Sequence, residues 1–144
     1  MDILIQNAKL SDLPDVFPLF KQLWPFIELN EESLEKMFRV ILSGNRDFML
    51  CSFFENKVNG FIAGSFINDF WHAGLVCHVS TLIVDVSVRK CNIGTALMNS
   101  VKELAIHNQC KAIELDSAFH REQTHAFYEK YGFVKRAFTF SLEL

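Results

Sequence analysis

Between residues 81 and 98 the chain passes from an apolar run, through a short polar and basic loop, into an amphipathic segment of helical spacing. Such a junction leaves backbone N–H groups unpaired at the start of the helix, and these groups, with the helix dipole, favour a bound anion. Arg89 and Lys90 add positive charge to the loop. The stretch therefore predicts a phosphate-binding site. The alternative is a plain strand-to-helix connection in which Lys90 is a solvated surface residue.

The elements that must position this loop follow from hydrophobic periodicity. The run from Leu75 to Val84 is apolar on both faces, which is typical of a strand inside a sheet, and the segment after it has the spacing of a helix that packs on that sheet. The predicted elements are, in order, a strand at 3–5, helices at 11–24 and 30–44, strands at 48–54, 61–67 and 75–84, a helix from Gly94, a strand at 111–116, a helix at 123–131, and one or two strands within 133–142. This order predicts a mixed sheet with helices on its faces.

Composition restricts the class of protein. The 144 residues fit one domain, 1–144, and half of them are hydrophobic, which suffices for one core. The net charge of −3 comes from interspersed charges without a basic block, which argues against nucleic acid as a partner. Four scattered cysteines form no Cys-x-x-Cys pair, so we expect reduced thiols and no metal site. No apolar run reaches the length of a membrane span, and we therefore expect a soluble, cytoplasmic protein without a membrane partner.

The loop after Val84 resembles a motif of the GNAT superfamily of acyl-CoA-dependent N-acyltransferases. Its pattern Arg89-x-x-Asn92-x-Gly94 is similar to the Arg/Gln-x-x-Gly-x-Gly/Ala loop with which that family binds the pyrophosphate of CoA. Asn92 stands where the family usually has its first glycine. Asparagine is the non-glycine residue that most readily adopts a positive φ, so the turn can form here at a small cost in strain.

Two further segments carry the resemblance over nearly the whole chain. Residues 127–133 read Phe-Tyr-Glu-Lys-Tyr-Gly-Phe, which is similar to the Phe-Tyr-x-x-x-Gly-Phe segment of the family. The opening Ile5-x-x-Ala8-x-x-x-Asp12 resembles the family's first strand and its entry into the first helix. The resemblance implies an α/β (α+β) fold: a mixed, mostly antiparallel twisted sheet of six to seven strands with about four helices.

The resemblance also implies how acetyl-CoA would be bound as the acyl donor. The pantetheine amides would pair with the backbone of Leu82, Ile83 and Val84, as an added strand pairs with a sheet edge. The pyrophosphate would meet mainly backbone N–H groups, with charge from Arg89. The residues expected around it are Arg89, Lys90, Asn92, Ile93, Gly94 and Thr95.

The implied reaction is the direct attack of a neutral primary amine on the thioester in a ternary complex. Tyr128 stands where the family places the tyrosine that donates to the CoA sulfur, and its alternative role is that of a core aromatic residue. His78, six residues before Val84, is the candidate base, because many family members have a carboxylate there. The alternatives are that His78 is a satisfied core residue and that water removes the proton.

The acceptor site is expected at two aromatic loops. In the family, the connection between the first two helices and the loop before the fourth strand shape this pocket. Aromatic rings with carboxylates suit a small cationic amine, although packing in a homodimer would explain the same aromatics. The residues expected there are Trp24, Phe26, Glu28, Asp69, Trp71 and, after the strand at 111–116, His120, which can instead help to cap the next helix.

Two other functions remain open from the sequence. The first is a catalytically silent acyl-CoA-binding module that acts as a sensor or regulator. The second is a nucleotide- or phosphate-binding protein unrelated to CoA. An acetyltransferase would release the thiol of CoA, whereas a silent acyl-CoA-binding module would not. A nucleotide- or phosphate-binding protein unrelated to CoA predicts that ATP, and not acetyl-CoA, stabilises the fold.

Overall fold

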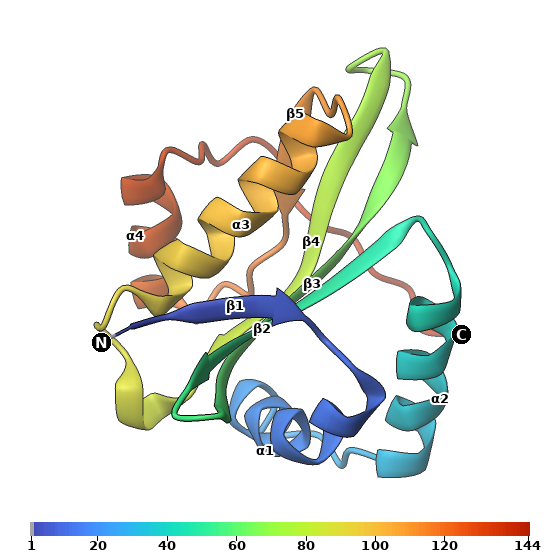
Figure 1. Ribbon diagram of the computed structural model, residues 1–144. Helices are drawn as coiled ribbons and strands as arrows, with labels where there is room; N and C mark the ends of the chain where they lie inside the picture. Colours follow the sequence, from blue (N-terminus) through green and yellow to red (C-terminus); the bar gives the residue numbers. More distant parts are fainter. Residues whose placement is uncertain (1) are drawn as a thin grey trace. The chain divides into compact units, whose positions relative to one another are not determined.

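The computed structural model describes residues 2–144, which fall into two compact units, one that ends at Glu114 and one formed by Leu115–Leu144. A five-stranded sheet has the order β1-β2-β3-β4-β5 (Figure 1). The elements are β1 (Leu4–Asn7), η1 (Leu10–Asp12), α1 (Leu13–Leu23), α2 (Glu31–Ser43), β2 (Asp47–Phe54), β3 (Lys57–Asp69), β4 (Gly74–Val84), η2 (Val86–Val88), α3 (Ile93–His107), β5 (Ala112–Leu115) and α4 (Glu122–Tyr131).

The first four strands are antiparallel neighbours. β3 and β4 form the longest pair, from Gly60 opposite Val84 to Asp69 opposite Gly74. The register shifts between Ala63 and Gly64, so Ser80 of β4 has no residue opposite it. A bulge of this kind increases the local twist and bends the strand that contains it, here just before the residues that lead to the predicted loop.

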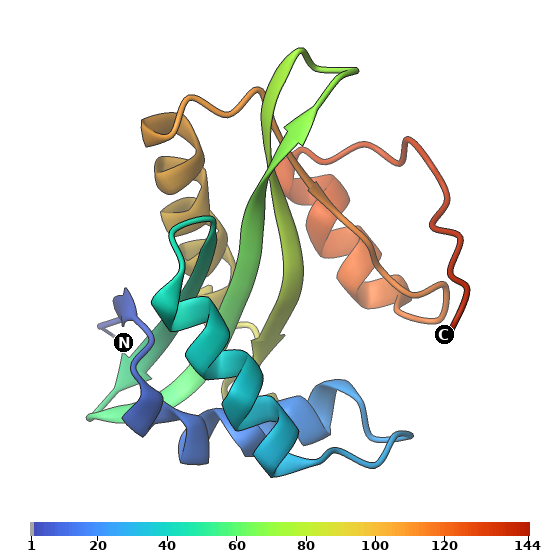
Figure 2. The same cartoon turned by 90° about the vertical axis from the view of Figure 1, so that its right-hand side faces the viewer.

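Helices cover both faces of the sheet in the first unit. On one face, α1 and α2 pack on β2 and β3, and Phe61 of β3 contacts the rings of Phe20 and Phe38 at centroid distances of 5.2 and 6.1 Å. On the other face lies α3, whose Ile93 and Leu97 approach Gly60 of β3. Figure 2 shows the sheet between α3 and the pair α1 and α2. Alternation along the strands supplies apolar side chains to both faces, as predicted for central strands.

The helix boundaries follow local signals. Asn30 caps α2, because its side chain accepts a hydrogen bond from the Ser33 N–H at 2.9 Å, and the helix ends at Gly44 as predicted. α1 ends before Pro25, also as predicted. Its start differs from the predicted range of 11–24, since the helix begins at Leu13 and Asp12 takes the cap position after the short turn η1. The Asp12 carboxylate accepts the Lys9 N–H at 2.8 Å, which stabilises that turn.

The hairpin between β2 and β3 is tighter than predicted. The expected turn at 55–60 shrinks to Glu55 and Asn56, which have φ values of 51° and 64°. Two successive residues with positive φ match the right-handed twist of the flanking strands, so the pairing continues almost to the tip. As a result β3 begins at Lys57, four residues before the predicted start.

The second unit contains α4, which ends at Gly132 with a φ of 123°. The strands predicted within 133–142 are wrong, because residues 133–144 form no strand. The described part of the chain therefore has five strands in its sheet where six to seven were expected. Alternating apolar residues satisfy a strand pattern, but a strand also needs a hydrogen-bonding partner, which no local pattern supplies. Within the described residues, no helix has the length and apolarity required to cross a membrane.

Candidate functional site

β5 runs along only a part of β4. The two strands meet near the start of β4, where the Lys111 N–H donates to the Leu75 carbonyl oxygen at 2.8 Å. Four residues of β5 extend about 13 Å, whereas Leu82 lies about 23 Å along β4 from Leu75. β5 therefore ends before it reaches Leu82, Ile83 and Val84. On the side of β4 that faces away from β3, the backbone groups of these three residues lie past the end of β5 and do not pair with it.

The chain leaves β4 through a hydrogen-bonded turn. The Asp85 N–H donates to the Asn59 carbonyl oxygen at 2.9 Å, and the Asp85 carboxylate accepts the Ser87 N–H at 3.0 Å. The hydrogen bond from the Ser87 N–H, and after it that from the Ser87 hydroxyl, hold the pKa of the Asp85 carboxyl below its ordinary value. A side chain from α1 also takes part, since Gln22 Oε1 accepts the Val86 N–H at 3.0 Å. The start of the predicted anion loop is thus fixed from three directions.

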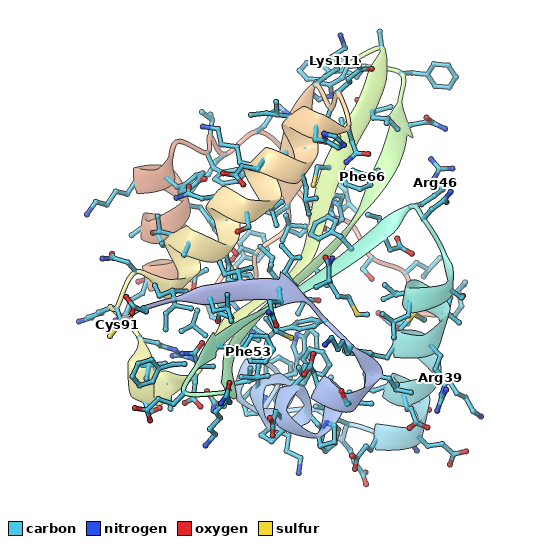
Figure 3. All side chains as sticks on the ribbon, viewed as in Figure 1. Arg39, Arg46, Phe53, Phe66, Cys91 and Lys111 are labelled. Carbon is cyan, nitrogen blue, oxygen red and sulfur yellow. The ribbon has the colours of Figure 1, made fainter. Side chains whose placement is uncertain are left out.

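The loop at 89–92 has an unusual backbone. Lys90 and Asn92 both have positive φ, at 66° and 65°. Asn92 adopts the left-handed conformation that was expected at the position of the family's glycine. Arg89 turns back toward the strand, and its Nε donates to the Val84 carbonyl oxygen at 3.1 Å. Figure 3 shows Cys91 at the end of α3 that this loop leads into, and Lys111 beyond the other end of α3.

The N-terminus of α3 has the features of an anion site. The helix starts at Ile93, one residue before the predicted start, and in the described structure the side chain of Asn92, at the cap position, does not cap its first turn. The N–H groups of Ile93, Gly94 and Thr95 therefore have no partner within the helix. Ile93 is 1% exposed and anchors the turn in the core, so the first-turn N–H groups have a fixed direction. Positive potential from the helix dipole is added to that of Arg89 and Lys90.

Tyr128 lies on α4 in an aromatic cluster of the second unit. Its ring contacts those of Phe127 and Phe133 at centroid distances of 5.5 and 5.6 Å. Burial raises the pKa of Tyr128 to about 12, although the charge of Arg121 opposes this shift. The phenol therefore stays protonated throughout the neutral range. It can donate a hydrogen bond but, in the absence of a ligand, does not act as a base.

His78 lies half-buried on β4, and its partner in the register is Ser65 of β3. The Ser65 hydroxyl donates to the Asp47 carboxylate, so the strand beside His78 carries a polar pair. His78 is six residues before Val84 on the same strand. The structure thus places it in the central strand, as predicted, and its part in proton transfer stays a hypothesis.

The loop before α4 contains a hydroxyl that the sequence patterns did not single out. The Ser117 side-chain oxygen is buried and has no hydrogen-bond partner among residues 2–144. The next residue, Ala118, is held by α4, because its carbonyl oxygen lies 3.1 Å from the Arg121 N–H and 2.9 Å from His125 Nε2. His125 thus fastens this loop to α4. His120, proposed for the acceptor site, follows in the same loop.

The residues predicted for the acceptor site fall into separate places. Trp24, Phe26 and Glu28 lie in the connection from α1 to α2, and Trp24 packs on Phe20 at 5.6 Å. Asp69 and Trp71 lie at the tip of the β3–β4 hairpin. Figures 1 and 2 both show this tip at the opposite end of the molecule's first unit from the α1–α2 connection. The structure therefore does not bring the two aromatic loops together.

The hairpin tip is a small ordered unit of its own. Asp69 Oδ2 lies 2.5 Å from His72 Nδ1 and also accepts the His72 N–H at 2.9 Å. The ring of His72 in turn contacts that of Trp71 at a centroid distance of 4.6 Å. Asp69 is thus engaged in holding the turn. Because its carboxylate already binds His72, Asp69 is less suited to bind an amine ligand.

The cysteines are free thiols, as predicted. Cys51 and Cys77 are fully buried, and burial raises the pKa of each to about 12. Burial also raises the pKa of Cys110. Cys91, in the 89–92 loop, is exposed. The two central thiols thus serve as small apolar core residues and not as nucleophiles.

The model of the acetyltransferase (GNAT) family matches residues 13–133. The match includes α1, β4, the 89–92 loop, α3 and Tyr128, and it spans most of the chain. The chain therefore belongs to the acetyltransferase (GNAT) family. No curated protein is similar enough in sequence to be matched.

Solved structures show the same fold at low sequence identity. The aminoglycoside N-acetyltransferase AAC(6')-Iy in complex with CoA has a TM-score of 0.88 at 16% identity, over 99% of this chain and 95% of that one. Glucosamine-6-phosphate N-acetyltransferase from Arabidopsis thaliana has a TM-score of 0.83 at 20% identity, over 99% of both chains. A GNAT family acetyltransferase from Staphylococcus aureus has a TM-score of 0.82 at 22% identity, over the full length of both. The fold is thus the GNAT α+β fold.

Proposed function

We propose that this protein is an N-acetyltransferase that transfers the acetyl group of acetyl-CoA to a primary amine of a small molecule or peptide. The observation that carries the proposal is the uncapped N-terminus of α3 directly after the 89–92 loop, in a chain of the acetyltransferase (GNAT) family. A similar fold is known in complex with CoA. These features support acetyl-CoA as donor over a nucleotide unrelated to CoA.

The donor would be held by main-chain groups at two places. The backbone of Leu82, Ile83 and Val84 would pair with the amides of the pantetheine arm, beyond the reach of β5. The N–H groups of Ile93, Gly94 and Thr95 would bind the pyrophosphate, with charge from Arg89. Both interactions depend on backbone direction more than on side-chain type, which explains how such a site tolerates Asn92.

In the proposed reaction the amine nitrogen attacks the thioester carbonyl carbon, the C–N bond forms and the C–S bond breaks. The ammonium proton leaves to His78 or to water, and the sulfur departs as a thiolate. Tyr128 would donate a hydrogen bond to that sulfur. Its pKa of about 12 lies above that of an ordinary thiol, about 8.5, so the phenol would stabilise the thiolate without giving up its proton to it. The thiolate would then take a proton from solvent.

The acceptor would be a small cationic amine. Glu28, beside Trp24 and Phe26 in the α1–α2 connection, offers a carboxylate together with aromatic rings. This connection is favoured over the hairpin tip as the acceptor region, because α1 ends beside the turn that follows β4. The hairpin tip with Asp69 and Trp71 lies at the other end of the first unit. His120 would be a further contact from the loop before α4.

The proposal is tested by measuring the release of free CoA thiol from acetyl-CoA. The acceptors are polyamines, aminoglycosides, amino acids, peptide N-termini and lysine peptides. An acetyltransferase releases thiol with at least one class and yields the acetylated amine by mass spectrometry. A protein that binds acetyl-CoA but releases no thiol with any of them would be a silent acyl-CoA-binding module. Stabilisation on heating by ATP and not by acetyl-CoA would contradict both functions.

A further inference from the structure

Gln22 links α1 to the turn that opens the predicted anion loop. It lies in the last turn of α1, half-buried, and its Oε1 accepts the Val86 N–H at 3.0 Å. The two residues are 64 positions apart, and Val86 begins η2, the first turn after β4. A glutamine side chain that reaches the backbone of a distant loop constrains the position of that loop.

The same amide group also acts on Asp85. After the Ser87 N–H, which contributes most, a side-chain hydrogen bond with Gln22 and the charge of Lys57 also hold the pKa of Asp85 low. Asp85 is tied to β3 as well, since its N–H donates to the Asn59 carbonyl oxygen at 2.9 Å. The Gln22 amide thus accepts the N–H of one residue of the turn and also lowers the pKa of the neighbouring carboxyl.

Between this turn and α3 the chain has little regular structure to hold it. Lys90 and Asn92 have positive φ, which is an unfavourable conformation for residues other than glycine. At its far end the loop is anchored by the buried Ile93. At its near end the anchors are Asp85 and the Gln22–Val86 hydrogen bond. The direction of the loop therefore depends on both ends.

We propose that Gln22 is a positioning residue for the diphosphate site: its amide holds the 85–88 turn, so that the 89–92 loop and the first turn of α3 present their N–H groups to the pyrophosphate of CoA. Gln22 does not touch the ligand. The proposal rests on the proposed function, in which this loop binds CoA. Loss of the Gln22 amide weakens CoA binding because the protein must then order the loop when the ligand binds.

The test uses Gln22→Met, which keeps the length and helix propensity of the side chain and removes the acceptor of the Val86 N–H. The matched control is Gln6→Met, the same change at an exposed position of the edge strand β1. CoA affinity is measured by isothermal titration calorimetry. The Kd of Gln22→Met is expected to rise by about 3- to 10-fold, as for the loss of one hydrogen bond, and that of Gln6→Met to stay unchanged.

Hydrogen exchange of the free protein separates positioning from a general loss of stability. Exchange in Gln22→Met should be faster at residues 86–95 and unchanged in the core strands β2 and β3. Faster exchange throughout the protein would overturn the proposal, as would wild-type CoA affinity in the variant. If Gln22→Met does not fold, Gln22→Lys is used, which keeps a polar end at this position and likewise removes the acceptor for the Val86 N–H. Its CoA affinity must also fall, and an unchanged Kd again overturns the proposal.

The two proposals fail in different ways. If the wild-type protein binds CoA and the folded Gln22 variant binds it equally well, only the positioning role is wrong. If the wild-type protein does not bind CoA, the proposed function is wrong, whatever the variants show.

Discussion

Arg89 Nε donates a hydrogen bond to the Val84 carbonyl oxygen at 3.1 Å. This contact joins the first residue of the 89–92 loop to the last residue of β4. A guanidinium group has five N–H donors in a planar fork, so the Nε contact orients the other donors. Lys90, the next residue along the chain, has no such tie among the contacts of the described residues and differs from Arg89 in this respect.

From this difference we predict unequal effects of two substitutions that remove the same charge. Arg89→Met should weaken CoA binding by about tenfold or more, because an oriented cation near a pyrophosphate contributes a charge-assisted hydrogen bond. Lys90→Met should weaken it by about twofold, as is typical of a solvated charge. Calorimetric titration with CoA measures both. Equal losses would show that charge alone, without orientation, matters in this loop.

Asn92 has a φ of 65° and a ψ of 16°, a conformation that glycine adopts without cost. Asn92→Gly should therefore leave CoA affinity unchanged or make it tighter. Asn92→Val should lower the free energy of unfolding by about 1–2 kcal/mol, because a β-branched side chain is strained at positive φ. Urea denaturation and CoA titration measure the two effects. A large loss of CoA affinity in Asn92→Gly would mean that the loop is not the pyrophosphate site.

Tyr128→Phe should lower turnover by about 10²-fold or more and leave CoA affinity nearly unchanged, because only the hydrogen bond to the departing sulfur is lost. The variant Tyr131→Phe, on the same helix, serves as the control and should keep its activity. Steady-state thiol release with an identified acceptor provides the measurement. Full turnover by Tyr128→Phe would contradict the assigned role.

The raised pKa of Tyr128 also predicts how stability depends on pH. The neutral phenol is favoured in the folded state, so its contribution is fully present below the unfolded pKa of about 10 and is lost as the pH rises through about 12. Urea unfolding of the wild-type protein between pH 8 and 11 should show a loss of stability toward alkaline pH. In Tyr128→Phe this part of the slope should be absent. An identical slope in both proteins would mean that Tyr128 ionises at its ordinary pKa.

Gly64 and Gly44 offer a matched pair of glycine substitutions. A Cβ at Gly64 would lie 2.2 Å from the His78 carbonyl oxygen and 2.7 Å from the ring of Phe48, beside the β4 bulge. A Cβ at Gly44 would meet nothing closer than 3.7 Å. Gly64→Ala should therefore destabilise the fold by about 1–3 kcal/mol or more, whereas Gly44→Ala should be nearly neutral. Urea denaturation of both variants checks the difference, and equal stabilities would show that the bulge adapts to a side chain.

Local signals in the sequence were enough to predict most elements. The cap at Asn30, the stops at Pro25 and Gly132, and the apolar run that forms β4 all act within a few residues, and the structure confirms the elements that they delimit. The positive φ at Asn92 was likewise expected from the residue type and its place in the motif. These features depend on backbone preferences that each short segment carries with it.

Contacts between distant segments were beyond such signals. The Gln22–Val86 hydrogen bond joins residues 64 positions apart, and no periodicity indicates it. The shortness of β5, the absence of strands at 133–144 and the separation of Glu28 from Asp69 also depend on which segments pair. The sequence by itself thus determined the family and most of the order of the elements, and it predicted the anion loop. Only the tertiary structure decided which side chains hold that loop in place, because pairing and packing depend on residues that are far apart in the chain.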